Sequence, residues 1–308
     1  MLNQENLQKL REFEKLDLLA NQIVEGFISG IHKSPFHGYS AEFAEHKIYN
    51  KGENTKNIDW KLYARTDKLF VKRFEEETNL RCHIIIDNSS SMHYPKLDSQ
   101  EPFYKSKIGF AVLAGLVLMN LLKKQRDAYG LSVFSDTYEY YAPEKTNNRH
   151  YQMLLSKLGQ ILSVDREQKQ TYTVDFLHQI AEKIHKRSMI VLFTDMFLTQ
   201  DEDKLFAALQ HLKHNKHKVV VFHTYSKRYE MDFDFANKPK KYVDLETGES
   251  INLYSSAVKE QYQDEVKKYF EKIALICSQY KIAYVPVNVE DNFDVILNTY
   301  LLEQKKFK

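Results

Sequence analysis

The chain has 308 residues, 43% of them hydrophobic and 13% aromatic, which is ample for a large folded core. Its charged residues balance to a formal net charge of +2, which excludes a bulk positive field for holding nucleic acid or an anionic membrane. The two cysteines have no CxxC spacing, so a disulfide framework and a cysteine zinc site are excluded, and a reducing cytoplasmic setting is expected.

The N-terminal part of the chain predicts a helix followed by an irregular segment. Apolar residues recur at helical spacing over residues 5–31, whereas residues 32–78 have no repeating core face and one short strand pattern at 69–74. We therefore expect residues 1–78 to be an extension packed on the domain formed by residues 79–308. Within it, Trp60 is expected to be a buried anchor, since tryptophan combines a large apolar body with a donor that needs a partner.

From residue 81 onward the pattern alternates between strands and helices. Strands are predicted at 82–86, 129–135, 138–142, 188–194, 219–224 and 283–289, and helices at 105–124, 150–162, 174–185, 201–214 and 258–280. Strands that are apolar on both faces and alternate with helices predict an α/β fold with a doubly wound, mostly parallel sheet. Turn residues predict a hairpin insertion near 240–253.

The longest apolar run is too short to cross a bilayer. Residues 108–119 are interrupted by Gly109 and Gly115 and followed by Asn120, so the run falls short of the roughly 20 residues that a membrane helix needs. The first residues also lack the basic-then-apolar pattern of a signal sequence. We expect a buried core helix and no membrane insertion.

Two predicted strands end in oxygen-bearing side chains. Asp87, Ser89 and Ser91 follow the first strand of the alternating region, and Asp195 follows the strand at 188–194. In a doubly wound sheet, ligands bind outside the carboxyl ends of the strands, and oxygen donors suit a hard cation such as Mg²⁺. The same serine loop is also compatible with a simple helix cap.

The loop Asp87-x-Ser89-x-Ser91, a later threonine and the strand-terminal Asp195 resemble the metal-ion-dependent adhesion site of von Willebrand factor A domains. That resemblance implies Ser89 and Ser91 as direct ligands of Mg²⁺ or Mn²⁺, and Asp87 and Asp195 as ligands directly or through water. It also implies a threonine ligand, for which Thr171 is preferred to Thr173.

The likeness extends along nearly the whole chain. Segments such as Asn57-Ile58-Asp59-Trp60-Lys61, Ala64-Arg65-Thr66-Asp67-Lys68 and Asp244-Leu245-Glu246-Thr247-Gly248 resemble a bacterial family of uncharacterised function, the DUF58 type, which carries a von Willebrand factor A-like domain. Its members are often associated with MoxR-type AAA+ ATPases. The resemblance implies a protein partner, either such an ATPase or its client.

Two functions are compatible with these residues. The first is a protein-interaction module without catalysis, in which an acidic side chain of the partner completes the coordination of the metal. The alternative is a metal-dependent hydrolase, for which His93, Asp98 and Asp136 are the candidate bases. The sequence has no glycine-rich phosphate-binding motif, so we expect any ATP to be bound by the partner.

Overall fold

The computed structural model describes residues 15–26, 40–49, 58–77, 80–97, 100–135, 138–163, 173–196, 202–244, 248–297 and 300. The chain divides into two compact units, the smaller formed by Phe36–Leu80 and the larger by Met1–Pro35 with Arg81–Lys308. The boundary predicted between residues 78 and 79 stays a prediction.

The smaller unit is a two-stranded ribbon with a short helix. Strands β1 (Ser40–Ile48) and β2 (Phe70–Glu77) pair antiparallel, and α2 (Trp60–Thr66) begins after Asp59, whose side chain accepts hydrogen bonds from two backbone amides of the helix. Trp60 is 63% exposed, and its ring meets Tyr63 edge-on. The expectation of a buried Trp60 is therefore wrong. Trp60 is the first residue of α2, and none of the residues of this helix is buried.

The larger unit contains a six-stranded sheet in the order β10-β7-β6-β3-β4-β5. Its strands are β3 (Arg81–Asp87), β4 (Ala128–Phe134), β5 (Tyr138–Lys145), β6 (Met189–Thr194), β7 (Lys218–Tyr225) and β10 (Ala283–Asn288). Only the β4–β5 pair is antiparallel; every other neighbouring pair in this sheet is parallel. Counted along the chain from β3, the order is that of a doubly wound sheet, which confirms the predicted fold class.

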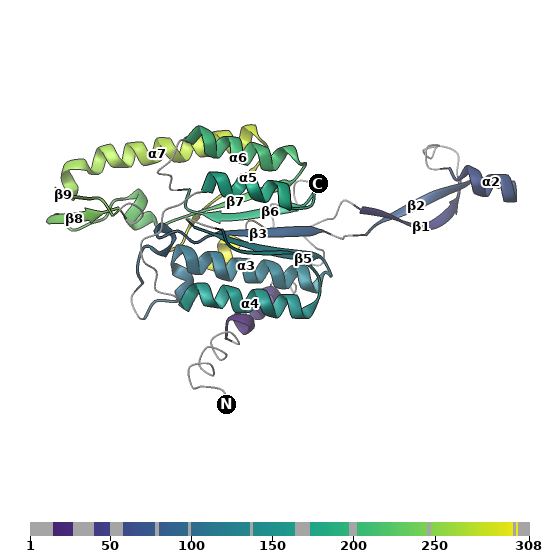
Figure 1. Cartoon of the computed structure of the whole chain (residues 1–308), viewed down its shortest axis with the longest axis horizontal. Helices are drawn as coiled ribbons and strands as arrows, with labels where there is room; N and C mark the ends of the chain where they lie inside the picture. Colours follow the sequence, from purple (N-terminus) through teal and green to yellow (C-terminus); the bar gives the residue numbers. More distant parts are fainter. Residues whose placement is uncertain are drawn as a thin grey trace, which may run out of the picture. The chain divides into compact units, whose positions relative to one another are not determined.

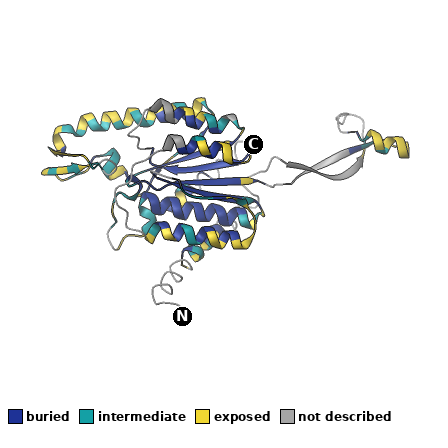
Figure 2. Cartoon of the chain, viewed as in Figure 1, coloured by how far each residue is buried: buried dark blue, intermediate teal, exposed yellow. Residues whose placement is uncertain are grey.

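Helices cover both faces of this sheet (Figure 1). One face carries α3 (Lys107–Lys124) and α4 (Asn148–Ser163), and the other carries α5 (Thr173–Lys183), α6 (Glu202–His214) and α7 (Ser255–Gln279). Figure 2 shows α3 buried along most of its length, as its continuous apolar sequence predicts. Among the described residues, no helix is long and apolar enough to cross a membrane.

The helix at residues 15–26 belongs to the larger unit. Asn120 of α3 donates a hydrogen bond to Asn21 at 2.7 Å, and Tyr151 of α4 donates one to Asp17 at 2.5 Å. The rest of the predicted helix over 5–31 lies outside the described residues. These polar contacts hold the N-terminal helix against the α3–α4 side of the sheet.

A hairpin extends the larger unit between β7 and α7. Strands β8 (Pro239–Val243) and β9 (Ser250–Tyr254) pair antiparallel, at the place where the sequence predicts a hairpin. A short π-helix, η4 (Lys227–Met231), connects β7 to this region. The hairpin and η4 form one wall of the cavity described below.

Candidate functional site

The candidate site lies at the ends of β3 and β6, the neighbouring strands between which the strand order of the sheet reverses; this position is the switch point of the sheet. Strands β3 and β6 are parallel neighbours, with Ile86 paired to Phe193, so Asp87 at the end of β3 comes beside Thr194. The Thr194 hydroxyl donates to Asp87 Oδ2 at 2.8 Å, and Asp195 follows directly. This switch point is the place where doubly wound sheets bind ligands.

The loop after β3 gathers three of the predicted ligands. The Ser89 amide donates to Asp87 Oδ1 at 3.0 Å, and the Ser89 and Ser91 hydroxyl oxygens lie 3.1 Å apart. All three residues are buried, and Ser91 begins the short 3₁₀ helix η2 (Ser91–His93). The carboxylate and the two hydroxyls therefore come together from five consecutive residues, 87–91.

The electrostatics at Asp87 favour a cation. Burial and, to a smaller extent, the negative charge of Asp195 raise the pKa of Asp87 to about 7, against hydrogen bonds from Ser89 and Thr194 that lower it. A divalent cation would relieve both effects, and carboxylate and hydroxyl oxygens are donors that Mg²⁺ accepts. The residues present thus fit the metal that the sequence predicts.

The proposed metal ligands include serine hydroxyls, so they are not a cluster made only of acidic and histidine side chains. In the described part of the chain, no group of three or more His, Cys, Asp or Glu side chains could hold a metal ion. Asp87 and Asp195 supply two carboxylates here, and Ser89 and Ser91 add only hydroxyls. Any remaining coordination would come from the threonine, from water or from a partner.

The threonine ligand is not located. Thr171 lies outside the described residues, and Thr173 begins α5 without a described side chain. The preference for Thr171 over Thr173 stays a prediction. Asp98 and Asp136, two of the candidate bases, also lie outside the described residues.

A buried lysine joins the site, and the sequence analysis missed it. Lys107, the first residue of α3, is fully buried, and its Nζ lies 2.9 Å from Asp195 Oδ2 and 2.5 Å from Glu230 Oε1. Burial lowers the pKa of Lys107, but the two carboxylates outweigh it and the net shift is upward. A lysine at the start of a helix gives no sequence signal of burial, and its partners are 88 and 123 residues away.

His93 is held by the loop that follows β3. Its Nε2 lies 3.0 Å from the side-chain oxygen of Asn88, and the Asn88 amide nitrogen donates to Glu139 at 2.9 Å. This contact fixes the imidazole through a neutral amide, an interaction that does not make histidine a stronger base. The arrangement gives the hydrolase alternative no support.

A second polar cluster resembles a hydrolytic triad in its order of contacts. His83 lies 2.6 Å from Ser132 Oγ through Nε2 and 2.6 Å from Glu144 through Nδ1. The three side chains come from β3, β4 and the edge strand β5, and all are buried, with His83 and Ser132 fully inaccessible. A substrate cannot reach this serine, so the cluster is a structural network that satisfies polar groups in the core.

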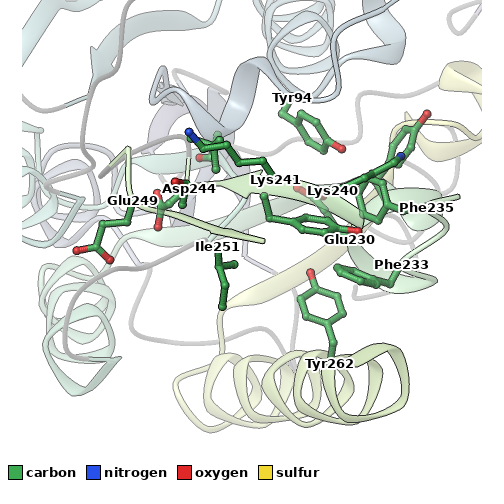
Figure 3. A pocket seen from close by; sticks show the side chains of 15 residues that line it. Tyr94, Glu230, Phe233, Phe235, Lys240, Lys241, Asp244, Glu249, Ile251 and Tyr262 are labelled. Carbon is green, nitrogen blue, oxygen red and sulfur yellow. The ribbon is translucent and has the colours of Figure 1, made fainter. Parts of the chain in front are cut away.

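A cavity of about 810 Å³ adjoins the loop after β3 at Ser91. Its walls come from η2, η4, the β8–β9 hairpin and α7, and six of its lining residues are aromatic: Tyr94, Tyr229, Phe233, Phe235, Tyr242 and Tyr262. Figure 3 shows Tyr262 reaching from α7 towards Phe233. The candidate metal site therefore has a large apolar neighbour.

Comparison with known proteins assigns the family. The family described as "Protein of unknown function DUF58" matches residues 45–271, which is most of the chain. The chain belongs to the DUF58 family. That assignment agrees with the resemblance noted in the sequence, and it leaves the biochemical role open.

Curated relatives of this DUF58 chain are themselves uncharacterised. They include Rv1480 of Mycobacterium tuberculosis and Mb1516 of Mycobacterium bovis, each 22% identical over 144 residues. The match covers 47% of this chain and 44% of the relative, so it spans less than half the length of either protein.

Solved structures with a similar arrangement are distant in sequence. BatB of Bacteroides thetaiotaomicron is 15% identical with a TM-score of 0.44, over 74% of this chain and 98% of that one. The SpRpn10 VWA domain is 14% identical with a TM-score of 0.40, over 71% of this chain and 94% of that domain. Our fold assignment rests on the strand order of the DUF58 chain itself.

The raised pKa of Asp87 predicts how stability changes with pH. Below about pH 4 the carboxyl is protonated in both the folded and the unfolded state, whose ordinary pKa is 3.8. Between about pH 4 and 7 the unfolded state loses this proton while the folded state keeps it, so the contribution of Asp87 to stability falls as pH rises.

Asp87→Asn is therefore expected to be more stable than wild type at pH 7.5 in metal-free buffer, and to lose that advantage near pH 4. Urea unfolding at several pH values measures the difference. An advantage that is the same at all pH values would contradict the assignment of this titration to Asp87.

Proposed function

We propose that this chain is a metal-dependent protein-interaction module. Mg²⁺ or Mn²⁺ would be held by Asp87, Ser89, Ser91 and Asp195, with Thr171 as a further ligand, and an acidic side chain of a partner would complete the coordination. The observation that carries the proposal is the convergence of Asp87, Ser89 and Ser91 beside Asp195 at the switch point of the sheet. The bound cation would supply the positive charge that joins the two proteins.

The proposed partner is a MoxR-type AAA+ ATPase or its client. Membership of the DUF58 family and the likeness of many separate segments support this proposal. The chain has no phosphate-binding glycine motif of its own, which is consistent with ATP hydrolysis residing in the partner. We place the module in the cytoplasm, because Cys82 and Cys277 are both free and buried.

Catalysis is not part of the proposal. A hydrolase would need a base aimed at a metal-bound water. His93 is bound to Asn88, and its geometry does not favour that role. Metal-dependent turnover of a generic phosphoester or ester, lost in Asp87→Ala, would replace the interaction module with the hydrolase alternative.

Metal-dependent capture of the ATPase tests the proposal. The tagged chain and a purified MoxR-type AAA+ ATPase are mixed with Mg²⁺, with EDTA, and with Asp87→Ala or Ser89→Ala/Ser91→Ala in place of wild type. Capture only by wild type with Mg²⁺ is expected. Equal capture in all samples would show that the partner binds elsewhere, and calorimetry with Mg²⁺ alone reports on the metal independently.

A further inference from the structure

The aromatic cavity and the candidate metal site share a wall. Ser91, one of the proposed metal ligands, lines the cavity, and so does Glu230, which Lys107 connects to Asp195. A partner chain whose carboxylate reaches the metal beside Ser91 therefore has its neighbouring residues at the mouth of this cavity. The volume of about 810 Å³ is within the range of cavities that enclose a ligand group.

The interior of the cavity suits an apolar group. The rings of Phe233, Phe235, Tyr242 and Tyr262 pack against one another with centroids 4.5 to 5.7 Å apart. The cluster offers an apolar group the faces and edges of several aromatic rings, against which another ring or an aliphatic chain packs favourably.

The charges in the wall argue against a cationic guest. Aromatic rings around a carboxylate are the usual cage for an ammonium group. Here the carboxylate is Glu230, and its Oε1 is already paired with the buried Lys107 ammonium at 2.5 Å. At the hairpin, Lys240 and Lys241 offset Asp244 and Glu249, so the rim has no charge excess to attract a cation (Figure 3). An aromatic or large aliphatic group is the better match.

We infer that the cavity binds a bulky apolar side chain adjacent to the acidic residue of the partner, so that the recognised segment is a carboxylate next to an aromatic residue. This inference rests on the proposed function, because it takes the metal beside Ser91 as the anchor for the carboxylate. The apolar side chain is the part of the partner's segment that would set specificity.

Three short peptides test the inference. Acetyl-Gly-Asp-Gly-amide supplies the carboxylate alone, and acetyl-Trp-Asp-Gly-amide and acetyl-Gly-Asp-Trp-amide add an indole on either side. Binding is measured by NMR titration of the full chain with Mg²⁺ and with EDTA. At least one tryptophan peptide is expected to bind on the order of tenfold to a hundredfold more tightly than the glycine peptide, from burial of one aromatic side chain.

A variant that fills the cavity provides the matched control. Ile251 lines the cavity and is 60% exposed, so Ile251→Trp should fold and occupy the space. Leu275, also 60% exposed, lies on α7 and does not line the cavity, so Leu275→Trp adds the same ring elsewhere. We expect the advantage of the tryptophan peptide to disappear in Ile251→Trp and to persist in Leu275→Trp.

The remaining outcomes separate this inference from the proposed function. Equal Mg²⁺-dependent binding of all three peptides would overturn the cavity as a subsite and leave the metal site standing. Tryptophan-peptide binding that survives EDTA and Asp87→Ala would overturn the link between the cavity and the metal. The absence of binding by all three peptides in a protein that binds Mg²⁺ by calorimetry would overturn the inference, and metal-dependent capture of the ATPase would then test the proposed function separately.

Discussion

Lys107→Met is expected to lower the free energy of unfolding by about 3–5 kcal/mol in metal-free buffer, the usual cost of removing one partner from a buried ion pair. Methionine keeps the length and apolar stem of the side chain but removes the ammonium. The buried Asp195 and the partly buried Glu230 are then left without their cation, at a site where Asp87 adds a further carboxyl. Urea unfolding at pH 7.5 measures the loss.

Lys124→Met is the control for this prediction. Lys124 ends the same helix, but its side chain is 35% exposed and its ion pair with Glu25 is long, at 3.8 Å. An exposed pair of this kind contributes at most about 1 kcal/mol. Similar losses in the two variants would show that Lys107 is not the cation on which this region depends.

Magnesium is expected to restore part of the stability lost in Lys107→Met, and to stabilise this variant more than it stabilises wild type. The reason is that a divalent cation at Asp195 replaces the missing positive charge. Thermal unfolding with and without Mg²⁺ measures the difference. An equal magnesium effect in both proteins would show that Lys107 and the metal do not act on the same carboxylate.

The second large effect concerns the ligands themselves. Asp87→Ala, and separately Ser89→Ala/Ser91→Ala, are expected to weaken Mg²⁺ binding by about a hundredfold or more, since even changes outside the ligand shell cost about ten- to a hundredfold. Calorimetric titration measures the affinity. Ser90→Ala is the matched control, because Ser90 lies in the same loop but outside the proposed ligand set. A similar loss in Ser90→Ala would mean that the loop, and not the ligand oxygens, had been disturbed.

Most of the sheet could be predicted from the sequence because its strands are apolar on both faces. The run ending at Asp87 and the run ending at Thr194 are buried throughout, and they appear as β3 and β6 in the structure. Helix α3 could be predicted as well, because most of its central residues are apolar. The two carboxyl residues after β3 and β6 followed from the strand ends and from the neighbouring positions that a doubly wound sheet gives them.

The smaller unit, the buried lysine and the cavity depend on contacts between residues far apart in the sequence, which local sequence patterns do not reveal. Strand β1 lies in a segment without a regular apolar period, and its pairing with β2 comes from residues 22 or more positions away. Trp60 was misjudged because aromatic character alone does not distinguish a core residue from an exposed one. Lys107 and the aromatic cavity were missed because their partners come together only when η4, the hairpin and α7 pack beside the loop after β3.

Calorimetric titration of the metal-free wild-type chain with Mg²⁺ and with Mn²⁺, beside Asp87→Asn, tests the central claim most directly. We predict one saturable site in wild type and none in Asp87→Asn at the same concentrations. Heat of binding in neither protein with either metal, or equal binding in both, would contradict the assignment of Asp87, Ser89, Ser91 and Asp195 as a metal site.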